Sequence, residues 1–437
     1  MTDCNLSKIE FPRCCGRRVE VDFAGGDISS NGGAQLLAAA DRRLGLLSGL
    51  VRRLDDARQA GKVAHKLLPL LRQRVYAVAL GHEDVNDHAG LRDDLALQTA
   101  VGRDERLASP STVGRLDRAA DRAWAWAAHV SMVEGFIASF DRAPAELVLD
   151  FDATDDPVHG RQIGRFFHGY YDHYCFLPLY VFCGDHLLVS YLRPSNIDGA
   201  KHAWAILALL VKRLRQAWPD VRIILRADSG FCRHRMLGWC ERQDIGYIVG
   251  LAKNARLNKD AETTMGQAEA AYRQSGQTQR LFAELHYGAK TWTKRRRVIA
   301  RLEHGAKGAN PRYVVTNLEG DGKELYERLY CQRGEMENRI KEQQLDLFAD
   351  RTSCHDWWPN QFRLIAASLA YCLIEAIRRL ALTGTDRARA QAGTIRLKLL
   401  RIGAVVMRNT RRVTLHLSSA CPDKALFHLV AARLKPG

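Results

Sequence analysis

The order of strand-like and helical segments after Pro144 is the feature that most limits what this chain can fold into. Alternating apolar residues predict strands, and apolar residues every three or four positions predict helices. The expected segments are, in order, the strand "ELVLDFD" (146–152), two strands in "HYCFLPLYVFCGDHLLVSYL" (173–192), a helix near 199–218, the strand "VRIILRAD" (221–228), a helix near 233–242 and the strand "IGYIVGL" (245–251). Three strands followed by alternating helices and strands predict a layered α/β sheet.

Two acidic residues, Asp152 and Asp228, end strands of this expected sheet. The strand order is that of the ribonuclease H-like fold, in which the first and fourth strands lie side by side, so the two strand ends are expected to meet. Because α/β sheets bind ligands at the carboxyl ends of their strands, a metal site is one interpretation. The alternative for Asp228 is an ordinary Asx turn before Ser229 and Gly230. The first acid stays open between Asp150 and Asp152, which share a strand face.

The charge balance favours a polyanionic partner. The 437 residues include 65 Lys and Arg against 49 Asp and Glu, which gives a net charge of +16. A surface this basic repels itself unless it meets nucleic acid or an anionic membrane. The N-terminal "MTDCNLSKIEF" lacks a signal-peptide pattern, and the longest apolar stretch, 364–374, is too short to span a bilayer. The sequence therefore indicates a DNA or RNA partner and no membrane.

The sequence lacks the motifs that mark several other classes of protein. The 11 cysteines are scattered without a CxxC pair, which argues against a disulfide framework and a structural zinc site and fits a reducing cytoplasm. No Gly-Lys-Ser/Thr phosphate loop is present, so nucleotide hydrolysis is not expected. His159, His168 and His173 match no metal-ligand spacing, and we interpret them as ordinary strand and loop histidines.

Helical geometry singles out a third acid in "YCQRGEMENRIKEQQ" (330–344). At about 100° per residue, one stripe of a helix over this segment carries Tyr330, Arg333, Glu337, Lys341 and Gln344. The other glutamates of the segment point away from that stripe. A solvated helix with charge pairs four residues apart accounts for the Glu–Lys pair. It accounts less well for the tyrosine and arginine on the same stripe.

Taken together, the three acidic segments resemble those of a known family. "LDFDATDDPVHG", "RADSGF" and "YCQRGEMENRIKE" are similar to the motifs of DDE-type bacterial insertion-sequence transposases with a Tyr-Arg-Glu-Lys signature helix. The chain most resembles the insertion-sequence 1380 family, whose leader is similar to "GGDISSNGG" and "GHEDVNDHAGLRDD". The resemblance covers nearly the whole chain. It departs at Gln344, where the signature has a lysine, and Lys341 on the same stripe can take that role.

The resemblance implies a site and a cofactor. The implied catalytic and metal-binding residues are Asp152, Asp228 and Glu337. The implied cofactor is a pair of Mg²⁺ ions, for which Mn²⁺ can substitute. Two such ions about 4 Å apart stabilise both the attacking and the leaving oxygen of a phosphodiester, and Mg²⁺ takes hard oxygen ligands. DNA contacts are expected from Tyr330, Arg333 and Lys341 on the signature helix.

The implied function is a DNA transposase that binds the terminal inverted repeats of its insertion sequence and catalyses strand cleavage and strand transfer. Its expected partners are double-stranded DNA, as element ends and as target, and a second copy of the chain, as a homodimer in the DNA complex. It would act in the bacterial cytoplasm, associated with the nucleoid. Two alternatives stay open: a domesticated or inactive relative that only binds DNA, and a ribonuclease H-like nuclease without transposition.

A further DNA contact is expected in "KTWTKRRRV", in the segment that follows the predicted sheet. Trp292 is flanked by the basic residues Lys294, Arg295, Arg296 and Arg297. Related transposases with a strand-rich insertion hold a flipped base on a tryptophan, and bases stack on aromatic rings beside cations. The alternative is a strand tryptophan packed on its own core beside a solvated basic run.

The expected organisation has five parts. We predict a helical N-terminal DNA-binding region over 1–140, after an irregular glycine-rich start. The catalytic core occupies 141–252 and, with its closing helices and the glutamate, 323–382. A strand-bearing subdomain is inserted at 253–322, and a basic region covers 383–437. The expected fold class is therefore α/β: a ribonuclease H-like mixed-sheet catalytic core with a strand-bearing insertion and a helical N-terminal region.

Overall fold

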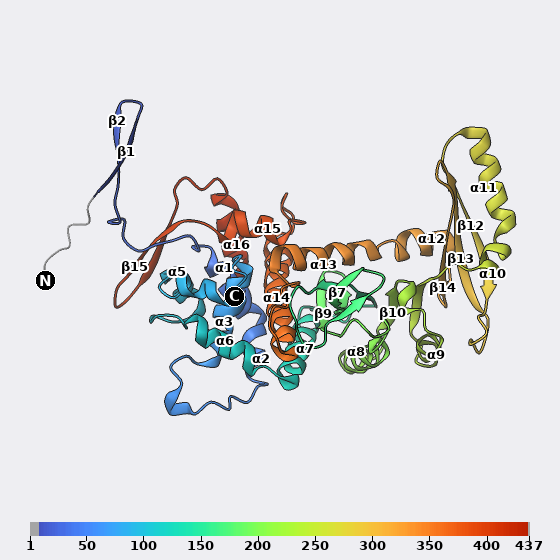
Figure 1. Cartoon of the computed structure of the whole chain (residues 1–437), viewed down its shortest axis with the longest axis horizontal. Helices are drawn as coiled ribbons and strands as arrows, with labels where there is room; N and C mark the ends of the chain where they lie inside the picture. The colour runs from blue at the N-terminus through green and yellow to red at the C-terminus, as the bar shows by residue number, and fades with distance from the viewer. Residues whose placement is uncertain (1–7, 436–437) are drawn as a thin grey trace. The chain divides into compact units, whose positions relative to one another are not determined.

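The computed structural model describes residues 8–435, which form two compact units (Figure 1). The described part of the first unit is made of 8–51, 55–116 and 376–435, and the second unit of 52–54 and 117–375. Each unit therefore combines segments that are distant in sequence. The five-part division expected from the sequence stays a prediction.

The first unit is mainly helical and contains two small sheets. Its helices are α1 (Ala34–Leu44), α2 (Leu46–Val51), α3 (Leu67–Ala79), α4 (His88–Leu91), α5 (Leu95–Val101), most of α6 (Pro110–Ala119), α15 (Ala392–Ile395) and α16 (Lys424–Leu434). Strands β15 (Ala404–Arg408) and β16 (Val413–Leu417) form a hairpin that pairs with β3 (Ile28–Ser29). Strands β1 (Ile9–Cys14) and β2 (Arg17–Val21) form a hairpin where the sequence predicted irregular chain. Both strands are almost fully exposed, so no buried face marks them in the sequence.

The second unit is built on an eight-stranded mixed sheet. The strand order is β12-β13-β14-β11-β10-β4-β8-β9. The strands are β4 (Glu146–Ala153), β8 (Leu179–Cys183), β9 (His186–Tyr191), β10 (Arg222–Ala227), β11 (Gly246–Leu251), β12 (Gln279–Tyr287), β13 (Arg296–Gly305) and β14 (Gly308–Thr316). Helices α8 (Ala203–Ala217) and α9 (His234–Arg242) connect its parallel strands. The architecture is thus mixed α/β.

The central pairing joins β4 and β10 in parallel. Leu149 lies opposite Leu225, and Phe151 lies opposite Ala227. β8 and β9 continue the sheet on one side as an antiparallel meander, and β11 continues it on the other side as a parallel strand. The expected adjacency of the first and fourth strands is confirmed by this register.

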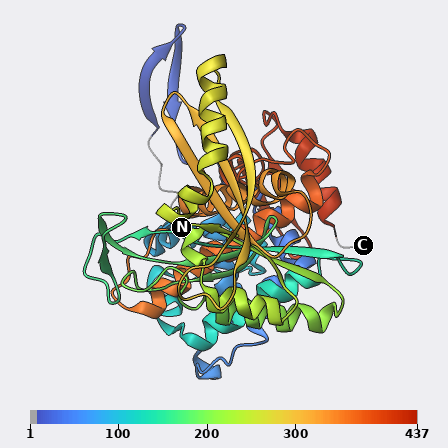
Figure 2. The ribbon, with the colours of Figure 1, turned by 90° about the vertical axis from the view of Figure 1, so that its right-hand side faces the viewer.

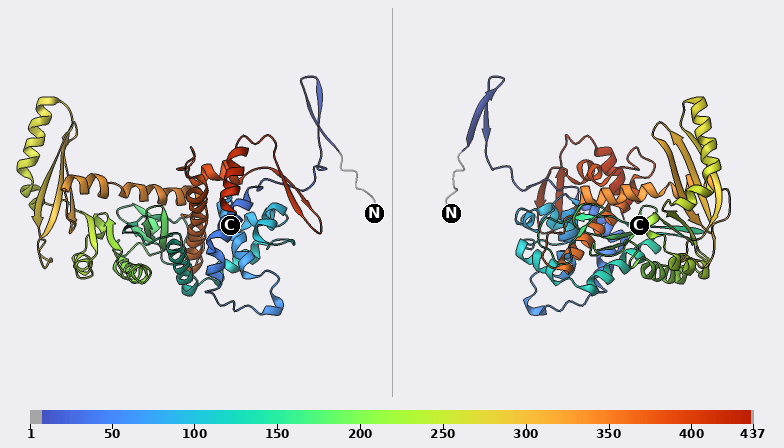
Figure 3. Two further views of the ribbon diagram at one scale, coloured as in Figure 1. Left: turned by 180° about the vertical axis from the view of Figure 1, so that it is seen from behind. Right: turned by 45° about the vertical axis from the view of Figure 1, so that its right-hand side comes forward.

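The segment 253–322 extends the same sheet. β14 pairs with β11 in antiparallel fashion, and β13 and β12 follow outward. Helices α10 (Ala255–Asp260) and α11 (Glu262–Ser275) precede these strands, and α11 packs on β12 and β13, as the yellow and orange part of the ribbon shows (Figure 3). The predicted strand-bearing character of this segment is confirmed, but its strands continue the large sheet instead of forming a separate one.

Alternation along the strands gives the sheet two different faces. Ile223, Leu225 and Ala227 of β10 belong to the large apolar core, which also takes in α8 and α9. Ile224 belongs to a smaller cluster on the other face, together with Tyr326. Because side chains alternate every second residue, Asp150, Asp152 and Arg226 lie on this second face. The green strands of this sheet can be followed in Figure 2.

Helical segments cover the second face. They are α12 (Gly322–Glu324), the π-helical η4 (Leu325–Tyr330), α13 (Arg333–Leu347) and α14 (Trp357–Ile377). The helical stretch is interrupted at 348–356, between α13 and α14, just before the position near 357–359 expected from the sequence. Pro359 lies in the first turn of α14, where its missing N–H would have no helical partner anyway. No described helix combines the length and the apolar character needed to cross a bilayer.

One glycine allows the close packing at the end of β11. A Cβ atom on Gly250 would come within 2.7 Å of the Ser229 backbone nitrogen and 2.8 Å of the Tyr330 hydroxyl oxygen. The turn after β10 and the end of η4 therefore meet over this position. Any larger residue would have to displace one of them.

Gly250→Ala should destabilise the protein by about 1–3 kcal/mol, the usual cost of an overpacked site. Gly266→Ala in α11 is the matched control, because a Cβ atom there would meet nothing within 4 Å. We expect the control to be neutral or to stabilise by up to about 1 kcal/mol, since alanine favours the helix over glycine. Urea unfolding of both variants measures the difference. Equal stabilities would contradict the close packing at Gly250.

Candidate active site

The parallel β4–β10 pairing brings two acids to one edge of the sheet. Asp152 is the penultimate residue of β4, and Asp228 directly follows β10. Their preceding residues, Phe151 and Ala227, are register partners. Backbone pairing alone therefore places the two carboxylates side by side on the face covered by η4 and α13.

Asp228 also starts a turn, as the alternative interpretation proposed. Its Oδ1 accepts a hydrogen bond of 2.8 Å from the Gly230 backbone N–H and caps the short 3₁₀ helix Ser229–Phe231. This bond fixes the orientation of the carboxylate and engages one of its oxygens. The Asx turn and a role in a site are thus compatible for Asp228.

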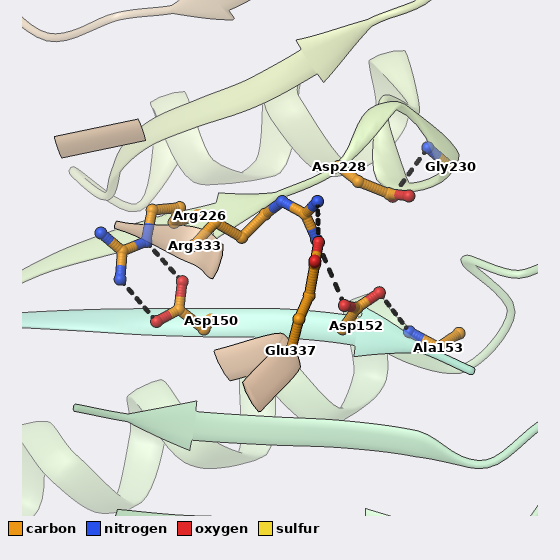
Figure 4. A network of polar contacts seen from close by, with 8 residues as sticks. All are labelled: Asp150, Asp152, Ala153, Arg226, Asp228, Gly230, Arg333 and Glu337. Atoms are coloured by element: carbon orange, nitrogen blue, oxygen red, sulfur yellow. Dashed lines mark hydrogen bonds and ion pairs between the residues drawn. The ribbon is translucent and has the colours of Figure 1, made fainter. Parts of the chain in front are cut away.

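Arg333 joins the third acid to the first. It begins α13, and its Nη1 donates to Asp152 Oδ2 at 3.2 Å. Its Nη2 donates to Glu337 Oε1, one helical turn further on. Figure 4 shows the guanidinium between these two carboxylates, with Asp228 across from them. The structure therefore brings Asp152, Asp228 and Glu337 to one place, and Arg333 supplies a positive charge there.

Asp150 has a different partner from Asp152. It is buried, and Arg226 on the neighbouring strand donates two hydrogen bonds to it, including Nη2 to Oδ2 at 2.7 Å. Arg226 also donates to the Leu329 carbonyl oxygen at 2.5 Å and so connects the sheet to η4. Burial raises the pKa of Asp150, and the paired Arg226 limits that rise. Of the two strand acids, Asp152 is the one that faces Arg333 and Glu337.

The charge environment of Asp152 is unusual for an aspartate. Its side chain is only 13% exposed. Burial raises the pKa of Asp152 to about 7, the Arg333 charge opposes this rise, and the nearby Asp228 and Glu337 add to it. Burial works against the charge of Arg333, but Asp152 and Glu337 outweigh it and raise the pKa of Arg333. The site thus concentrates negative charge that needs a cation.

The donor set suits a hard divalent cation, which binds carboxylate oxygens. Among residues 8–435, however, no group of three or more His, Cys, Asp or Glu side chains is already arranged as a metal site. The guanidinium of Arg333 bonds to oxygens of both Asp152 and Glu337. Asp152, Asp228 and Glu337 are the carboxylates here that could supply such oxygens, and two of them are bonded to Arg333.

A pocket opens beside these carboxylates. It has a volume of about 220 Å³ and is lined by Asp152, Ala153, Thr154, Glu337, Ile340, Lys341 and Gln344. Lys341 is exposed at this pocket, and Gln344 donates to the Asp155 carbonyl oxygen at 3.0 Å. Tyr330 lies over Gly250, and burial raises its pKa to about 12. The predicted stripe therefore does line the site, although Tyr330 belongs to η4 and precedes α13.

The structure places Trp292 and the basic run elsewhere. Trp292 follows β12 in the turn before β13, not in a strand, and packs partly buried against the large core on the opposite face of the sheet. Its ring meets that of Tyr287 edge-on at 5.6 Å, and the Arg296 guanidinium lies 5.1 Å from it. The register places Ile299 of β13 level with Gly250, near the end of β11. Trp292 precedes the start of β13, so it lies toward the opposite end of the strands.

The basic residues near Trp292 are paired within the protein. Arg296 is buried and bonds to Glu241, which also pairs with Lys294 at 3.1 Å. Arg297 pairs with Glu284. Arg295 donates to the His286 carbonyl oxygen. These residues are not brought to the three carboxylates, and their predicted contact with DNA stays a prediction.

Comparison with known proteins identifies the family of the chain. The family profile described as "Transposase DDE domain group 1" matches residues 11–436. The chain belongs to this transposase family. A search of curated proteins found no match.

Solved structures give a distant likeness. The structure is similar to one described as "Cryo-EM structure of piggyBac transposase synaptic complex with hairpin DNA (SNHP)", with a TM-score of 0.42 and 11% sequence identity. The match covers 84% of this chain and 78% of that one. The family assignment rests on the profile match over nearly the whole chain.

Two features of the site were not anticipated from the sequence. One is the guanidinium of Arg333 between the carboxylates, where a phosphate contact was expected. The other is a strand hairpin rich in aromatic residues, β6 (Phe166–His168) and β7 (His173–Phe176), in the segment between β4 and β8. The density of aromatic residues in "FFHGYYDHYCF" (166–176) was the signal that could have revealed it.

Replacing each strand acid by asparagine should change the free energy of unfolding, and the two changes should have opposite signs when divalent metal is absent. Folding raises the pKa of Asp152, so the ionised carboxylate destabilises the folded state. This destabilisation is complete above about pH 7 and vanishes below about pH 4, where the carboxyl group is protonated in both states. Asp152→Asn should therefore stabilise the protein by up to about 4 kcal/mol at pH 8, and the gain should shrink toward pH 5.

Burial raises the pKa of Asp150 too, but Asp150 accepts two hydrogen bonds from the buried Arg226. Asp150→Asn is therefore the matched variant and should destabilise by about 3–5 kcal/mol, because Arg226 then keeps a buried charge without its partner. Urea unfolding in EDTA at pH 8 and pH 5 measures both effects. A destabilised Asp152→Asn at pH 8 would contradict the account of the site.

Proposed function

We propose that this chain is the transposase of a bacterial insertion sequence, of the insertion-sequence 1380 family, and that it cuts and joins DNA at Asp152, Asp228 and Glu337. The observation that carries the proposal is that β4–β10 pairing sets Asp152 beside Asp228, while Arg333 bonds both Asp152 and Glu337 of α13. The substrates would be the terminal inverted repeats of the element and the target DNA. The core would be ribonuclease H-like, in keeping with the order β9-β8-β4-β10-β11 within the sheet.

The three acids would hold two Mg²⁺ ions, or Mn²⁺ in their place, which supply Lewis-acid stabilisation of the attacking and leaving oxygens. Asp228 is preorganised by its bond from Gly230, and Asp152 by its own strand and the Ala153 backbone N–H at 2.9 Å. Arg333 would release Asp152 and Glu337 and turn to the DNA backbone. Burial is the main cause of the raised pKa of Asp152, and the neighbouring Asp228 and Glu337 add to it, so a cation bound there would favour the ionised carboxylate.

Lys341 and Tyr330 complete the proposed DNA-facing stripe. Lys341 is exposed at the pocket beside Asp152 and Glu337, where a phosphate next to the scissile bond would lie. Gln344 holds the Asp155 carbonyl oxygen, so Lys341 is the lysine available for the signature. A homodimer on paired element ends and a helical DNA-binding region over 1–140 remain parts of the proposal, as does base binding at Trp292.

A cleavage assay distinguishes this function from its alternatives. The substrate is a labelled duplex carrying the element end, incubated with Mg²⁺, with Mn²⁺, or with EDTA. A transposase gives metal-dependent nicks at the end and products joined to target DNA. Nicks without joined products would favour a ribonuclease H-like nuclease, and binding without nicks would favour an inactive DNA-binding relative.

Each carboxylate should be required for cleavage. Asp152→Asn, Asp228→Asn and Glu337→Gln should each lower the cleavage rate by a factor of about 10³ or more, because loss of a single preorganised electrostatic contact already costs about 10²–10³. Binding of the uncut end, measured by gel shift in EDTA, should stay within about twofold. Near wild-type cleavage by any of these variants would remove that residue from the site.

Lys341 should contribute one phosphate contact. Lys341→Ala should weaken binding of the element end and reduce the salt dependence of the binding constant by about one charge. Lys212→Ala is the matched control, since Lys212 is exposed on α8, which packs on the opposite face of the sheet. The measurement is a titration at several salt concentrations. An equal slope for Lys341→Ala and wild type would leave Lys341 as a solvated residue.

A further inference from the structure

A separate three-stranded sheet lies in the chain between β4 and β8, next to the edge of the large sheet that carries the carboxylates. Its strands are β5 (Asp156–Pro157), β6 (Phe166–His168) and β7 (His173–Phe176), in the order β5-β7-β6. β7, labelled in Figure 1, leads directly into β8, whose Leu179 pairs with Ala153 next to Asp152. We call β6, β7 and their connecting turn the aromatic hairpin.

The outer face of the aromatic hairpin is exposed and aromatic. Phe167 and Tyr174 are register partners, their rings meet edge-on at 5.7 Å, and they are 53% and 47% exposed. Arg165, two residues before Phe167, places its guanidinium 4.3 Å from the centre of the Tyr174 ring. Tyr170 in the turn is 84% exposed. Large aromatic rings left in water beside an arginine are a surface that favours a flat, anionic ligand.

The base of the hairpin is held firmly. The Ile163 backbone N–H donates to the His355 carbonyl oxygen at 2.9 Å, and the Ser195 hydroxyl donates to the Phe166 carbonyl oxygen at 2.8 Å. Gly164 has a positive φ of 88°, and a Cβ atom there would lie 2.6 Å from the Trp357 ring. The exposed rings are thus presented by an anchored backbone, which lowers the entropy cost of binding.

The inner side of the hairpin leads to the carboxylates. His173 Nε2 lies 2.9 Å from Asp155 Oδ2, and Gln344 of α13 bonds to the Asp155 carbonyl oxygen. Tyr171 in the turn is half-buried, and its pKa is raised first by burial and then by the charges of Asp155 and Asp152. The aromatic hairpin and the proposed site therefore belong to one continuous part of the structure.

We propose that the outer face of the aromatic hairpin binds unpaired DNA bases next to the phosphate that is cut. This inference rests on the proposed function. Bases would stack on Phe167, Tyr170 and Tyr174, because every base has a flat face and stacking tolerates any sequence. Arg165 and the exposed Arg161 would hold the flanking phosphates.

Two observations favour unpaired DNA over another occupant. Over 161–174 the two arginines outnumber the one carboxylate, Asp172, so the charge complements a polyanion. The hairpin also lies at the carboxyl end of β4, whereas Trp292 packs on the opposite face of the sheet. Under the proposed function, DNA is cut at the carboxyl end of β4. Bases that are unpaired next to the cut would find a stacking surface in the aromatic hairpin at that end.

The test compares two DNA probes in EDTA, so that binding is measured without cleavage. One probe is a labelled element-end duplex with a four-nucleotide unpaired tail containing 2-aminopurine, and the other is the same duplex without the tail. Wild type should bind the tailed probe more tightly and change the 2-aminopurine fluorescence. In Phe167→Ala/Tyr170→Ala the preference for the tail should fall about tenfold, equivalent to about 1.4 kcal/mol. Affinity for the blunt duplex should stay within about twofold.

Three further variants make the result decisive. Trp126→Ala, at a tryptophan that is 57% exposed on α7 (Arg122–Ile137) of the same unit, should keep the tail preference. Tyr170→Trp should also keep it, because a flat ring remains. Tyr170→Ala alone removes a ring that is 84% exposed, so it tests the proposal if the double variant fails to fold.

An unchanged tail preference in the double variant would overturn the inference, as would an equal loss in Trp126→Ala. A double variant that keeps the tail preference but dissociates in sedimentation would show that the hairpin binds a second copy of the chain, and would also overturn it. Hairpin-dependent tail binding by a chain that cuts no DNA would refute the proposed function while supporting this inference. Normal cutting together with tail binding independent of the hairpin would refute the inference alone.

Discussion

The parallel pairing of β4 with β10 is the interaction on which the site depends. It sets Phe151 opposite Ala227, so the acids that follow each residue emerge at the same edge and on the same face. A shift of one residue in this register would turn Asp152 and Asp228 to different faces, because side chains alternate along a strand.

Two arginines pair with the carboxylates on this face, and they differ in their surroundings. Arg226 is buried with Asp150 and bonds to η4, which makes it part of the framework. Arg333 bonds to Asp152 and Glu337 from the first turn of α13, beside a pocket. Each arginine opposes the rise in pKa that burial causes in one strand acid, Arg226 for Asp150 and Arg333 for Asp152. Under the proposed function, a metal ion and a phosphate would compete for the partners of Arg333.

The two faces of the sheet separate the groups with which DNA could be bound. α13 and the aromatic hairpin lie with the carboxylates, whereas Trp292 and Arg296 pack against the large core toward the other end of the strands. The second group is also largely satisfied by protein partners such as Glu241. Under the proposed function, contact with the reacting phosphate would fall to the first group, whereas the residues of the basic run bond to protein partners beside their own strands.

The sequence by itself determined the strand order and the acids at the strand ends, because alternation and helical periodicity depend on neighbouring residues only. It also determined that Glu337 shares a stripe with Arg333 and Lys341. The resemblance already favoured Asp152 over Asp150, but only the tertiary structure shows that Asp150 pairs with Arg226 of another strand and Asp152 with Arg333 of a helix. It likewise decided the burial of Arg296 and the exposure of Tyr170. Burial and charge pairing join residues far apart in the chain, and local sequence patterns carry no record of such contacts.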